Sequence, residues 1–351
     1  MADLAISTVF FEHHRQAFGV AETNPRISWR FEGSVSDWEQ SSYDIEVARQ
    51  GVKKDKTNLF SFNSSNSVYV PWPDEALGEA EAASVRVRAH SNDGLSTPWS
   101  DWANVETALL SNDGWDGAVP ITADLFQNNN STAKRPIYFR NDFRVPEGSI
   151  ASARLYITGL GIYEAEINGE RVGDLVLAPG WQSYNHRHVY DSYDVTSLIN
   201  SGHNAIGVIV GEGWFLGRLG SDSVRDTYGD CIGLLSTLVI TLQDGTTVTV
   251  PTGEDWTASG GPIVSGEIYD GEVYDARLEK QIEHWSTSKF SARGKAWSKV
   301  RTLPPLTGKL TPPDQPGIRK IEVRDAQKIL KSPSGKTIVD FGQNLVGWHK
   351  Y

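Results

Sequence analysis

The sequence predicts an all-β protein. Short segments that alternate apolar and polar residues run through the whole chain, and each is bounded by Gly, Asn, Asp or Pro. The 351 residues include 33 Gly and 16 Pro, whereas stretches with the period of an amphipathic helix are hard to find. Alternation places every second side chain on one face of a strand, and frequent turn residues end such strands early. These observations favour sandwich or barrel architecture.

Composition and charge exclude several classes of function. The apolar fraction of 39% is sufficient for a hydrophobic core. The formal net charge of -11 argues against a nucleic-acid partner, because phosphates would be repelled. Apolar runs are only a few residues long, whereas a membrane span needs about 20, so no membrane partner is expected. No secretory leader is visible and Cys231 is the only cysteine, so we favour a cytoplasmic location over secretion.

The first region, residues 1–107, has the strand spacing of a sandwich domain. Apolar and polar residues alternate at 27–31, at 43–48 and at 84–89. The segment from Ser96 to Trp102 is typical of the closing strand of a fibronectin type III module. We therefore expect a fibronectin type III-like or immunoglobulin-like β-sandwich, because such domains use short strands over roughly 100 residues. A turn-rich linker is expected to follow over 108–134.

The second region, residues 135–302, predicts a larger β-sandwich. Alternating or β-branched segments occur at 154–158, 163–167, 204–210 and 234–242. Asn168-Gly169 predicts a tight hairpin that joins 163–167 to 170–172, since Asn-Gly is the strongest short hairpin signal. Many strands with long intervening loops indicate a jelly roll.

The last region, residues 303–351, begins as an extended connector. Its first part, 303–316, contains five prolines, at 304, 305, 312, 313 and 316. Two short strands are expected at 321–323 and 337–341. Together they indicate the start of a third β domain.

An acidic segment at 267–277 is the first candidate site. It carries four carboxylates and two tyrosines within eleven residues. Paired carboxylates can perform the acid–base chemistry of glycosidases, and hard oxygen ligands can bind calcium. An exposed turn with salt bridges to Arg277 or Arg187 explains the same residues, and we favour that interpretation for the segment taken alone.

Two Gly-flanked, tryptophan-rich loops, at 178–184 and 211–215, are the second candidate. Indole faces stack on the C–H faces of sugars, and neighbouring acids accept hydrogen bonds from sugar hydroxyls. The alternative, at even weight, is that these side chains plug the ends of the sandwich. The candidates for sugar binding in both segments are Trp181, Tyr184, Glu212, Trp214, Asp270, Glu272 and Tyr274.

Metal ligands stay unassigned. His186 and His188 alternate, which would place both imidazoles on one face of a strand. Zinc needs three or four ligands and no third is evident, so a solvated loop is the favoured interpretation.

Several motifs agree, in order, with one known family. The stretches "YEAEINGERVGD" (163–174), "LAPGWQSY" (177–184), "YDVTSLINSGHNAIGVIVGEGWF" (193–215), "YGD" (228–230) and "SGEIYDGEVYDAR" (265–277) resemble the N-terminal β domain of bacterial-type α-L-rhamnosidases. "NPRISWRF" and "PWSDW" resemble the fibronectin-like module that precedes it, and "VDFGQNLVGW" resembles the first strands of the β domain that follows.

The resemblance implies a glycoside hydrolase that releases terminal non-reducing α-L-rhamnose from glycosides by inversion. In that family the acid and base carboxylates lie in an α/α barrel that follows these domains. The resemblance therefore assigns no catalytic residue to this chain, and it implies that the chain alone is inactive and truncated before the barrel. The expected partners are that barrel and a rhamnose-containing glycoside.

The resemblance also implies that no cofactor is required. Some relatives bind rhamnose on the jelly roll through calcium, but Gln182-Ser183 stands where many of them carry Asp or Asn. Two alternatives remain, a stand-alone carbohydrate-binding module and a structural interaction module, both without catalytic activity.

Overall fold

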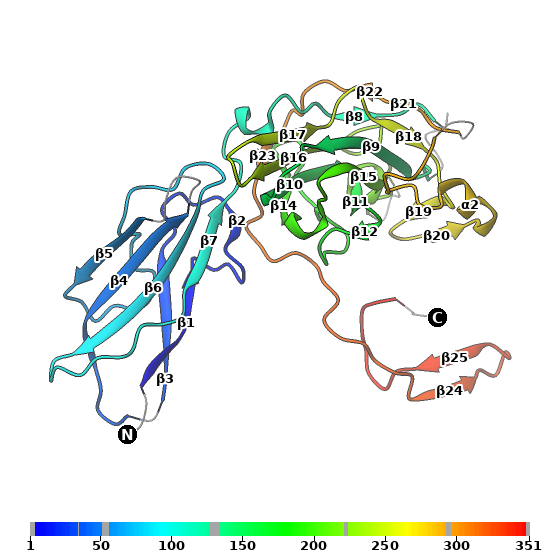
Figure 1. Ribbon diagram of the computed structural model, residues 1–351. Coiled ribbons are helices and arrows are strands. Elements are labelled where there is room, and N and C mark those ends of the chain that lie inside the picture. Colours follow the sequence, from blue (N-terminus) through cyan, green and yellow to red (C-terminus); the bar gives the residue numbers. More distant parts are fainter. Residues whose placement is uncertain are drawn as a thin grey trace.

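The computed structural model describes residues 4–33, 35–50, 56–125, 133–220, 224–292 and 296–348. Two β-sandwich domains follow one another along the chain, and a two-stranded hairpin stands apart from them (Figure 1). Regular structure is nearly all strand, which confirms the all-β prediction. In the described ranges, no helix has the length and apolar character needed to span a membrane.

The described residues of the N-terminal domain form seven strands. They are β1 (Ala5–Phe11), β2 (Phe18–Val20), β3 (Ile27–Glu32), β4 (Gln40–Gln50), β5 (Lys56–Phe62), β6 (Ala82–Ser91) and β7 (Ala103–Thr107). β1 pairs with β3, and the other strands form a sheet in the order β2-β7-β6-β4-β5. Alternating residues such as Ile27, Trp29 and Ile45 are buried between the sheets. The predicted immunoglobulin-like sandwich is confirmed.

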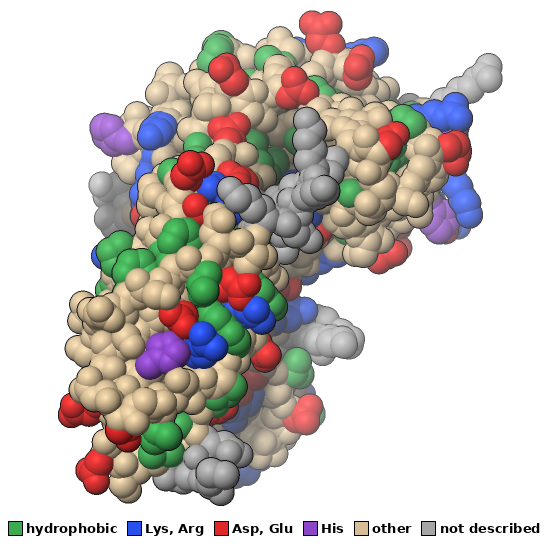
Figure 2. Space-filling model, turned by 60° about the vertical axis from the view of Figure 1, so that its left-hand side comes forward, with side chains coloured by type: hydrophobic (Ala, Val, Ile, Leu, Met, Phe, Trp, Pro, Cys, Tyr) green, Lys and Arg blue, Asp and Glu red, His purple; other side chains and the backbone are tan. Residues whose placement is uncertain are grey.

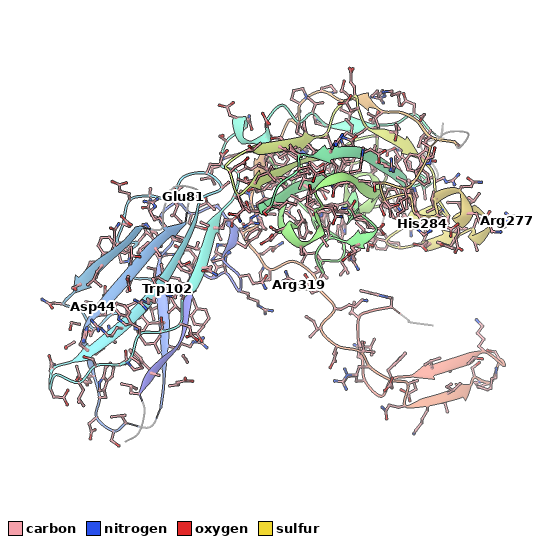
Figure 3. The ribbon with its side chains drawn as sticks, in the orientation of Figure 1. Asp44, Glu81, Trp102, Arg277, His284 and Arg319 are labelled. Carbon is pink, nitrogen blue, oxygen red and sulfur yellow. The ribbon has the colours of Figure 1, made fainter. Side chains whose placement is uncertain are left out.

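The motif at 98–102 does not form the closing strand that the sequence predicts, since β7 begins after it. The indoles of Trp99 and Trp102 contact arginine side chains of β6. The Arg86 guanidinium lies 4.9 Å from the Trp99 ring centroid and 4.7 Å from that of Trp102. Arg88 donates to Asp44, which lies with Trp102 on this domain (Figure 3). These cation–π contacts accompany single backbone bonds to β6, in which the Thr97 N–H donates to the Ala89 carbonyl and the Ser100 N–H to the Val87 carbonyl.

The second domain is the jelly roll. Its strands are β8 (Ile121–Thr122), β9 (Ile137–Val145), β10 (Ile150–Leu160), β11 (Ile162–Ile167), β12 (Glu170–Arg171), β13 (Arg187–Val189), β14 (Asp191–Asp194), β15 (Gly202–Gly211), β16 (Gly233–Leu242), β17 (Thr247–Pro251), β18 (Thr257–Ser259), β21 (Ser298–Lys299) and β22 (Arg301–Thr302). One sheet has the order β14-β10-β16-β8-β22, with β17 also on β16, and the other has the order β12-β11-β15-β9-β18-β21. Phe139, Leu155 and Trp256 are fully buried in the core of this domain.

The structure of this domain tests two sequence predictions, the tight hairpin at 168–169 and the linker at 108–134. Ile167 pairs with Glu170, and Asn168 and Gly169 have φ values of 53° and 88°, so the predicted tight hairpin is confirmed. The sequence predicts a linker over 108–134, but part of this segment belongs to the jelly roll, because β8 pairs with β16 there. Residues 126–132 of that segment lie outside the described residues.

The two domains share an interface of their own. Arg154 of β10 donates to both carboxylate oxygens of Glu106 on β7, at 2.6 Å and 2.9 Å. Beside it, the Tyr190 hydroxyl donates to the Leu109 carbonyl, and the ring of Trp115 meets Tyr190 edge-on at 5.0 Å. A small buried apolar cluster thus joins the domains.

The first part of the connector that begins at residue 303 packs against the jelly roll, and the chain then departs from this domain. β23 (Lys309–Thr311) pairs in parallel with β13, and Leu306 packs against the core. Arg319 then donates to Asp174 at 2.8 Å, close to the point where the chain departs (Figures 1 and 3).

The final hairpin pairs β24 (Lys328–Lys331) with β25 (Thr337–Asp340). The strand expected at 337–341 is present, but 321–323 is unpaired and exposed. A tight turn, in which the Ser332 N–H donates to the Lys336 carbonyl, selects 328–331 as the partner instead.

Surface charge is mixed on the face that Figure 2 shows. Acidic and basic side chains are interspersed there with hydrophobic ones, over both domains. On this face, the net negative charge is therefore spread out rather than gathered in one patch.

Candidate functional site

Trp181 and Trp214 lie together at one end of the jelly roll. Trp214 belongs to α1 (Gly213–Leu216), and Trp181 to the loop before β13. Their rings are parallel within 2°, with centroids 6.3 Å apart. Trp181 is 54% exposed and Trp214 is half-buried. A ring sandwiched between two indoles needs about 7 Å, twice an ordinary stacking distance, so no ligand ring fits between Trp181 and Trp214.

Gly213, the first residue of α1, allows this helix to lie close to Ile162. Gly213 has φ of 52°, and a Cβ there would lie 2.5 Å from the Ile162 side chain. Only glycine adopts this conformation at such close approach without strain. Glycine at 213 therefore lets α1, which carries Trp214, begin directly against Ile162 at the start of β11.

Tyr184 supports the two loops from below. It is 2% exposed, and its ring lies 5.1 Å from Phe215 and 5.0 Å from Tyr228. Its hydroxyl donates to the Gly180 carbonyl at 3.0 Å. The ring is thus buried beneath the surface that a sugar would meet.

Glu212 is a buried anchor. It is 1% exposed, and it accepts hydrogen bonds from Arg225 at 3.0 Å and from the Lys134 backbone N–H at 2.7 Å. Burial raises the pKa of the Glu212 carboxyl, while the Lys134 N–H and the Arg225 charge oppose that rise. Its role is to fix Arg225 rather than to touch a ligand.

Asp270 lies on the far side of the same arginine. Its carboxylate accepts from Arg218 at 2.6 Å and lies 4.0 Å from the Arg225 guanidinium. The side chain remains 58% exposed. The acidic segment and the loop of Trp214 are therefore brought together at this end of the domain.

Glu267 and Arg218 make that contact. Glu267 is one of the four carboxylates of the predicted acidic segment but was not among the sugar-binding candidates, and Arg218 was not singled out from the sequence. The Glu267 carboxylate accepts three backbone N–H groups, from Arg218 at 2.9 Å, Tyr269 at 2.8 Å and Asp270 at 2.9 Å. The one available signal was the position of Arg218, four residues after Trp214 in a Gly-rich run.

The other two candidates lie on a projecting hairpin. It consists of β19 (Ile263–Glu267) and β20 (Gly271–Tyr274), followed by η3 (Ala276–Leu278) and α2 (Glu279–Ile282). Glu272 is exposed opposite Gly266, and the Tyr274 hydroxyl donates to Glu279 at 2.8 Å. Arg277 does pair with Asp275, at the tip that Figure 3 labels, whereas Arg187 pairs with Asp314.

His188 corrects the prediction of a solvated loop. It is 3% exposed, and its ring lies 5.5 Å from Tyr184 within the buried aromatic group. Burial lowers the pKa of its imidazole to about 4, so the ring is neutral at ordinary pH.

The donor set at this end does not fit calcium. Calcium takes six to eight oxygen ligands, several of them carboxylates. In the described part of the chain, no group of three or more His, Cys, Asp or Glu side chains could hold a metal ion. Residues 182 and 183 offer only neutral oxygens, and Glu212 is engaged by Arg225.

Comparison with known proteins identifies the family. Residues 148–322 match the family model described as the alpha-L-rhamnosidase N-terminal domain, and residues 6–111 match the Rha78A-like, N-terminal immunoglobulin domain. The chain is 34% identical over 350 residues to an alpha-L-rhamnosidase of Formosa agariphila, a match that covers 96% of this chain. The chain carries the N-terminal domains of the α-L-rhamnosidase family. The resemblance predicted from the motifs is thereby confirmed.

Solved α-L-rhamnosidase structures share this fold. The structure of the Aspergillus terreus α-L-rhamnosidase is 51% identical with a TM-score of 0.93, and the match covers 98% of this chain and 39% of that one. The Streptomyces avermitilis α-L-rhamnosidase, solved with L-rhamnose, is 22% identical with a TM-score of 0.87 and shows the same fold. This chain spans 37% of the length of the Formosa relative.

Proposed function

We propose that this chain is the N-terminal, non-catalytic part of an α-L-rhamnosidase that removes terminal non-reducing α-L-rhamnose from glycosides by inversion. In this proposal the chain supports the catalytic barrel and binds sugar. The support is the match to the Aspergillus terreus structure over 98% of this chain, while 39% of that chain is matched. The catalytic carboxylates of such an enzyme would then lie outside these domains.

The exposed Trp181 ring carries the sugar-binding part of the proposal. An indole that is 54% exposed while parallel to a second, half-buried indole is held in one orientation before any ligand arrives. An aromatic face fixed in this way binds the C–H face of a sugar at low cost in conformational entropy. The Arg218–Asp270 pair on the neighbouring turn supplies polar groups for the hydroxyls.

A second candidate function is protein docking by the same end of the domain. Tyr269 and Val273 are 59% and 56% exposed on the projecting hairpin, close in sequence to Asp270. Exposed apolar side chains of this kind also occur at protein interfaces. In that case Trp181 would contact protein rather than sugar.

Calorimetric titration with L-rhamnose distinguishes the two. We expect residues 1–351 to bind L-rhamnose and the Trp181→Ala variant to lose most of that affinity. Trp102→Ala is the matched control, because Trp102 is a 42% exposed indole on the other domain. Absence of binding by the unaltered chain, or equal binding by Trp181→Ala, would reject sugar binding at this face.

A further inference from the structure

The connector contacts the loop that carries Trp181 at both ends of that loop. The Trp181 loop, residues 177–186, lies between β12 and β13. We propose that connector residues 308–319 are a strap, which fixes the Trp181 loop while it is docked and frees the loop when it is displaced. The inference concerns the conformation of the loop, so it does not depend on which ligand the loop binds.

The C-terminal end of the loop is held by backbone pairing. β23, which is part of the strap, pairs in parallel with β13. The Lys309 N–H donates to the His186 carbonyl at 2.9 Å, and the Tyr190 N–H donates to the Thr311 carbonyl at 3.1 Å. Bonds of this kind fix the backbone of both segments at once. Displacement of β23 therefore releases this end of the loop.

Gly308 allows the strap to lie this close to the loop. A Cβ at this position would lie 2.8 Å from the Tyr184 carbonyl oxygen and 2.9 Å from the Arg187 backbone nitrogen. Both are backbone atoms, so they cannot turn away as the end of a flexible side chain could. Glycine is the residue that permits such a close approach of two backbones. Any larger residue would therefore push the strap and the loop apart.

The N-terminal end of the loop is held farther along the strap. The Val176 N–H donates to the Ile318 carbonyl at 2.9 Å, and Leu175 lies opposite Arg319 in a β-bridge. The Arg319 guanidinium also donates to Asp174 at 2.8 Å. The side chains of that ion pair are 34% and 69% exposed, and an exposed pair stabilises a contact only weakly. We therefore expect this end of the strap to open first.

Two buried polar atoms on the paired strands favour release of the strap. They are His188 Nδ1 on β13 and Thr311 Oγ1 on β23, and neither forms a hydrogen bond with another described residue. Burying a polar atom without a partner costs free energy, which is recovered when water reaches that atom. The docked strap is therefore less stable than its backbone bonds alone would make it.

Displacement of the strap would leave the loop attached to the sandwich between its two ends. The Tyr163 N–H of β11 donates to the Ala178 carbonyl at 2.9 Å, a contact that does not involve the strap. The ends of the loop would then move about this point, and Trp181 with them. The strap leads into the final hairpin, which stands apart from both domains (Figure 1). A displacement of that hairpin would thus reach Trp181 through the strap.

Hydrogen–deuterium exchange of residues 1–351 and three variants tests the strap. Gly308→Ala places a methyl group against the loop backbone, and Arg319→Gln removes the exposed ion pair at the other end. Gly253→Ala is the matched control, since a Cβ at Gly253 would meet no atom within 4 Å. Peptides that cover 177–187 report on the loop, and peptides that cover β4 and β6 report on global unfolding.

We expect Gly308→Ala to speed exchange of the Gly180 and His186 amides about tenfold, the effect of losing backbone hydrogen bonds at one end of the loop. Both amides donate to carbonyls within the loop, so their exchange does not simply report contact with the strap. Arg319→Gln should speed exchange of the Gly180 amide about threefold, because an exposed ion pair contributes less. Gly253→Ala should exchange as the unaltered chain does.

Unchanged exchange of the Gly180 and His186 amides in Gly308→Ala would overturn the strap. Equal acceleration in β4 and β6 would also reject it, because the methyl group would then have destabilised the whole protein. If Gly308→Ala does not fold, Arg319→Gln decides, and unchanged exchange of its Gly180 amide would reject the inference. These measurements contain no sugar, so they stand or fall separately from the proposed sugar binding.

Discussion

The Trp214 ring lies parallel to the Trp181 ring at a centroid distance of 6.3 Å, too close for a ligand to enter between them. Trp214 therefore supports Trp181 from behind, and the two rings are not opposite walls of a slot. We therefore expect substitutions of the two tryptophans to have different effects on sugar binding.

Removing Trp214 is expected to weaken sugar binding less than removing Trp181. Trp181→Ala deletes the stacking face, so L-rhamnose affinity should fall by about tenfold or more, with unfolding changed by less than about 0.5 kcal/mol. Trp214→Ala leaves that face but frees its orientation, and it also removes a half-buried side chain that packs against the core. Fluorescence titration and thermal unfolding measure both effects. A larger binding loss from Trp214→Ala than from Trp181→Ala would contradict this arrangement.

The hairpin at Asn168-Gly169 should be sensitive to side-chain branching. Gly169 has φ of 88°, and a Cβ there would lie 3.1 Å from Thr287. Gly169→Val is expected to destabilise the protein by about 1 kcal/mol or more, because a β-branched residue resists positive φ. Gly169→Asn is the control, since Asn tolerates this conformation. An unchanged denaturation midpoint for Gly169→Val would refute the prediction.

The buried carboxyl of Asp191 should make the free energy of unfolding depend on pH. Asp191 is 6% exposed, and burial raises its pKa from 3.8 to about 6, opposed by the Tyr163 hydroxyl and the Arg319 charge. Because the folded value is the higher one, its stabilising contribution is complete below pH 3.8 and is lost as pH rises through about 6. The difference corresponds to about 3 kcal/mol.

The measurement compares the unaltered chain with Asp191→Asn by chemical denaturation between about pH 4 and pH 7. The amide does not titrate, so the free energy of unfolding of the variant should fall less over this range. Parallel pH profiles for the two proteins would show that Asp191 does not contribute.

The pair that joins the two domains should contribute more than a surface ion pair. The side chains of Arg154 and Glu106 are 20% and 12% exposed. Glu106→Gln is expected to cost about 1–3 kcal/mol, since it weakens two charge-assisted hydrogen bonds. Glu164→Gln, in the more exposed pair with Arg171, should cost less than about 0.5 kcal/mol. Equal effects of the two substitutions on denaturation would contradict a specific interdomain role.

Local sequence signals predicted the features that depend on few residues. The Asn168-Gly169 turn needs only two residues that tolerate positive φ, and alternation over short segments defines most strands. The Trp181 and Trp214 loops were found because each is flanked by glycine. The family motifs then gave the order of the two domains.

Long-range contacts explain what the sequence did not predict. Glu267 binds the Arg218 backbone across a separation of 49 residues, so no local pattern predicts that these two residues meet. His188 is buried by Tyr184 and by Phe215, which comes from a distant loop. The indoles at 99 and 102 contact Arg86 of β6, and the segment before them bonds to β6 at single backbone positions without forming a strand.

The geometry of the carboxylates predicts that the chain alone has no glycosidase activity. Inverting hydrolysis needs an acid and a base roughly 6.5–9.5 Å apart, with the sugar and a water between them. Here Glu212 is 1% exposed, and the Arg225 guanidinium lies between it and Asp270. Because Glu212 is buried and bound to Arg225, its carboxylate is not open to a sugar or to an attacking water.

The most direct test is therefore an assay of residues 1–351 with an aryl α-L-rhamnoside. The Aspergillus terreus α-L-rhamnosidase at equal concentration, and a version of this chain extended by the unmatched remainder of that relative's chain, are assayed beside it. The account predicts turnover by the relative and by the extended version, and none above buffer by residues 1–351. Turnover by residues 1–351 that is lost in Asp270→Asn or Glu272→Gln would contradict it and would place the active site in the jelly roll.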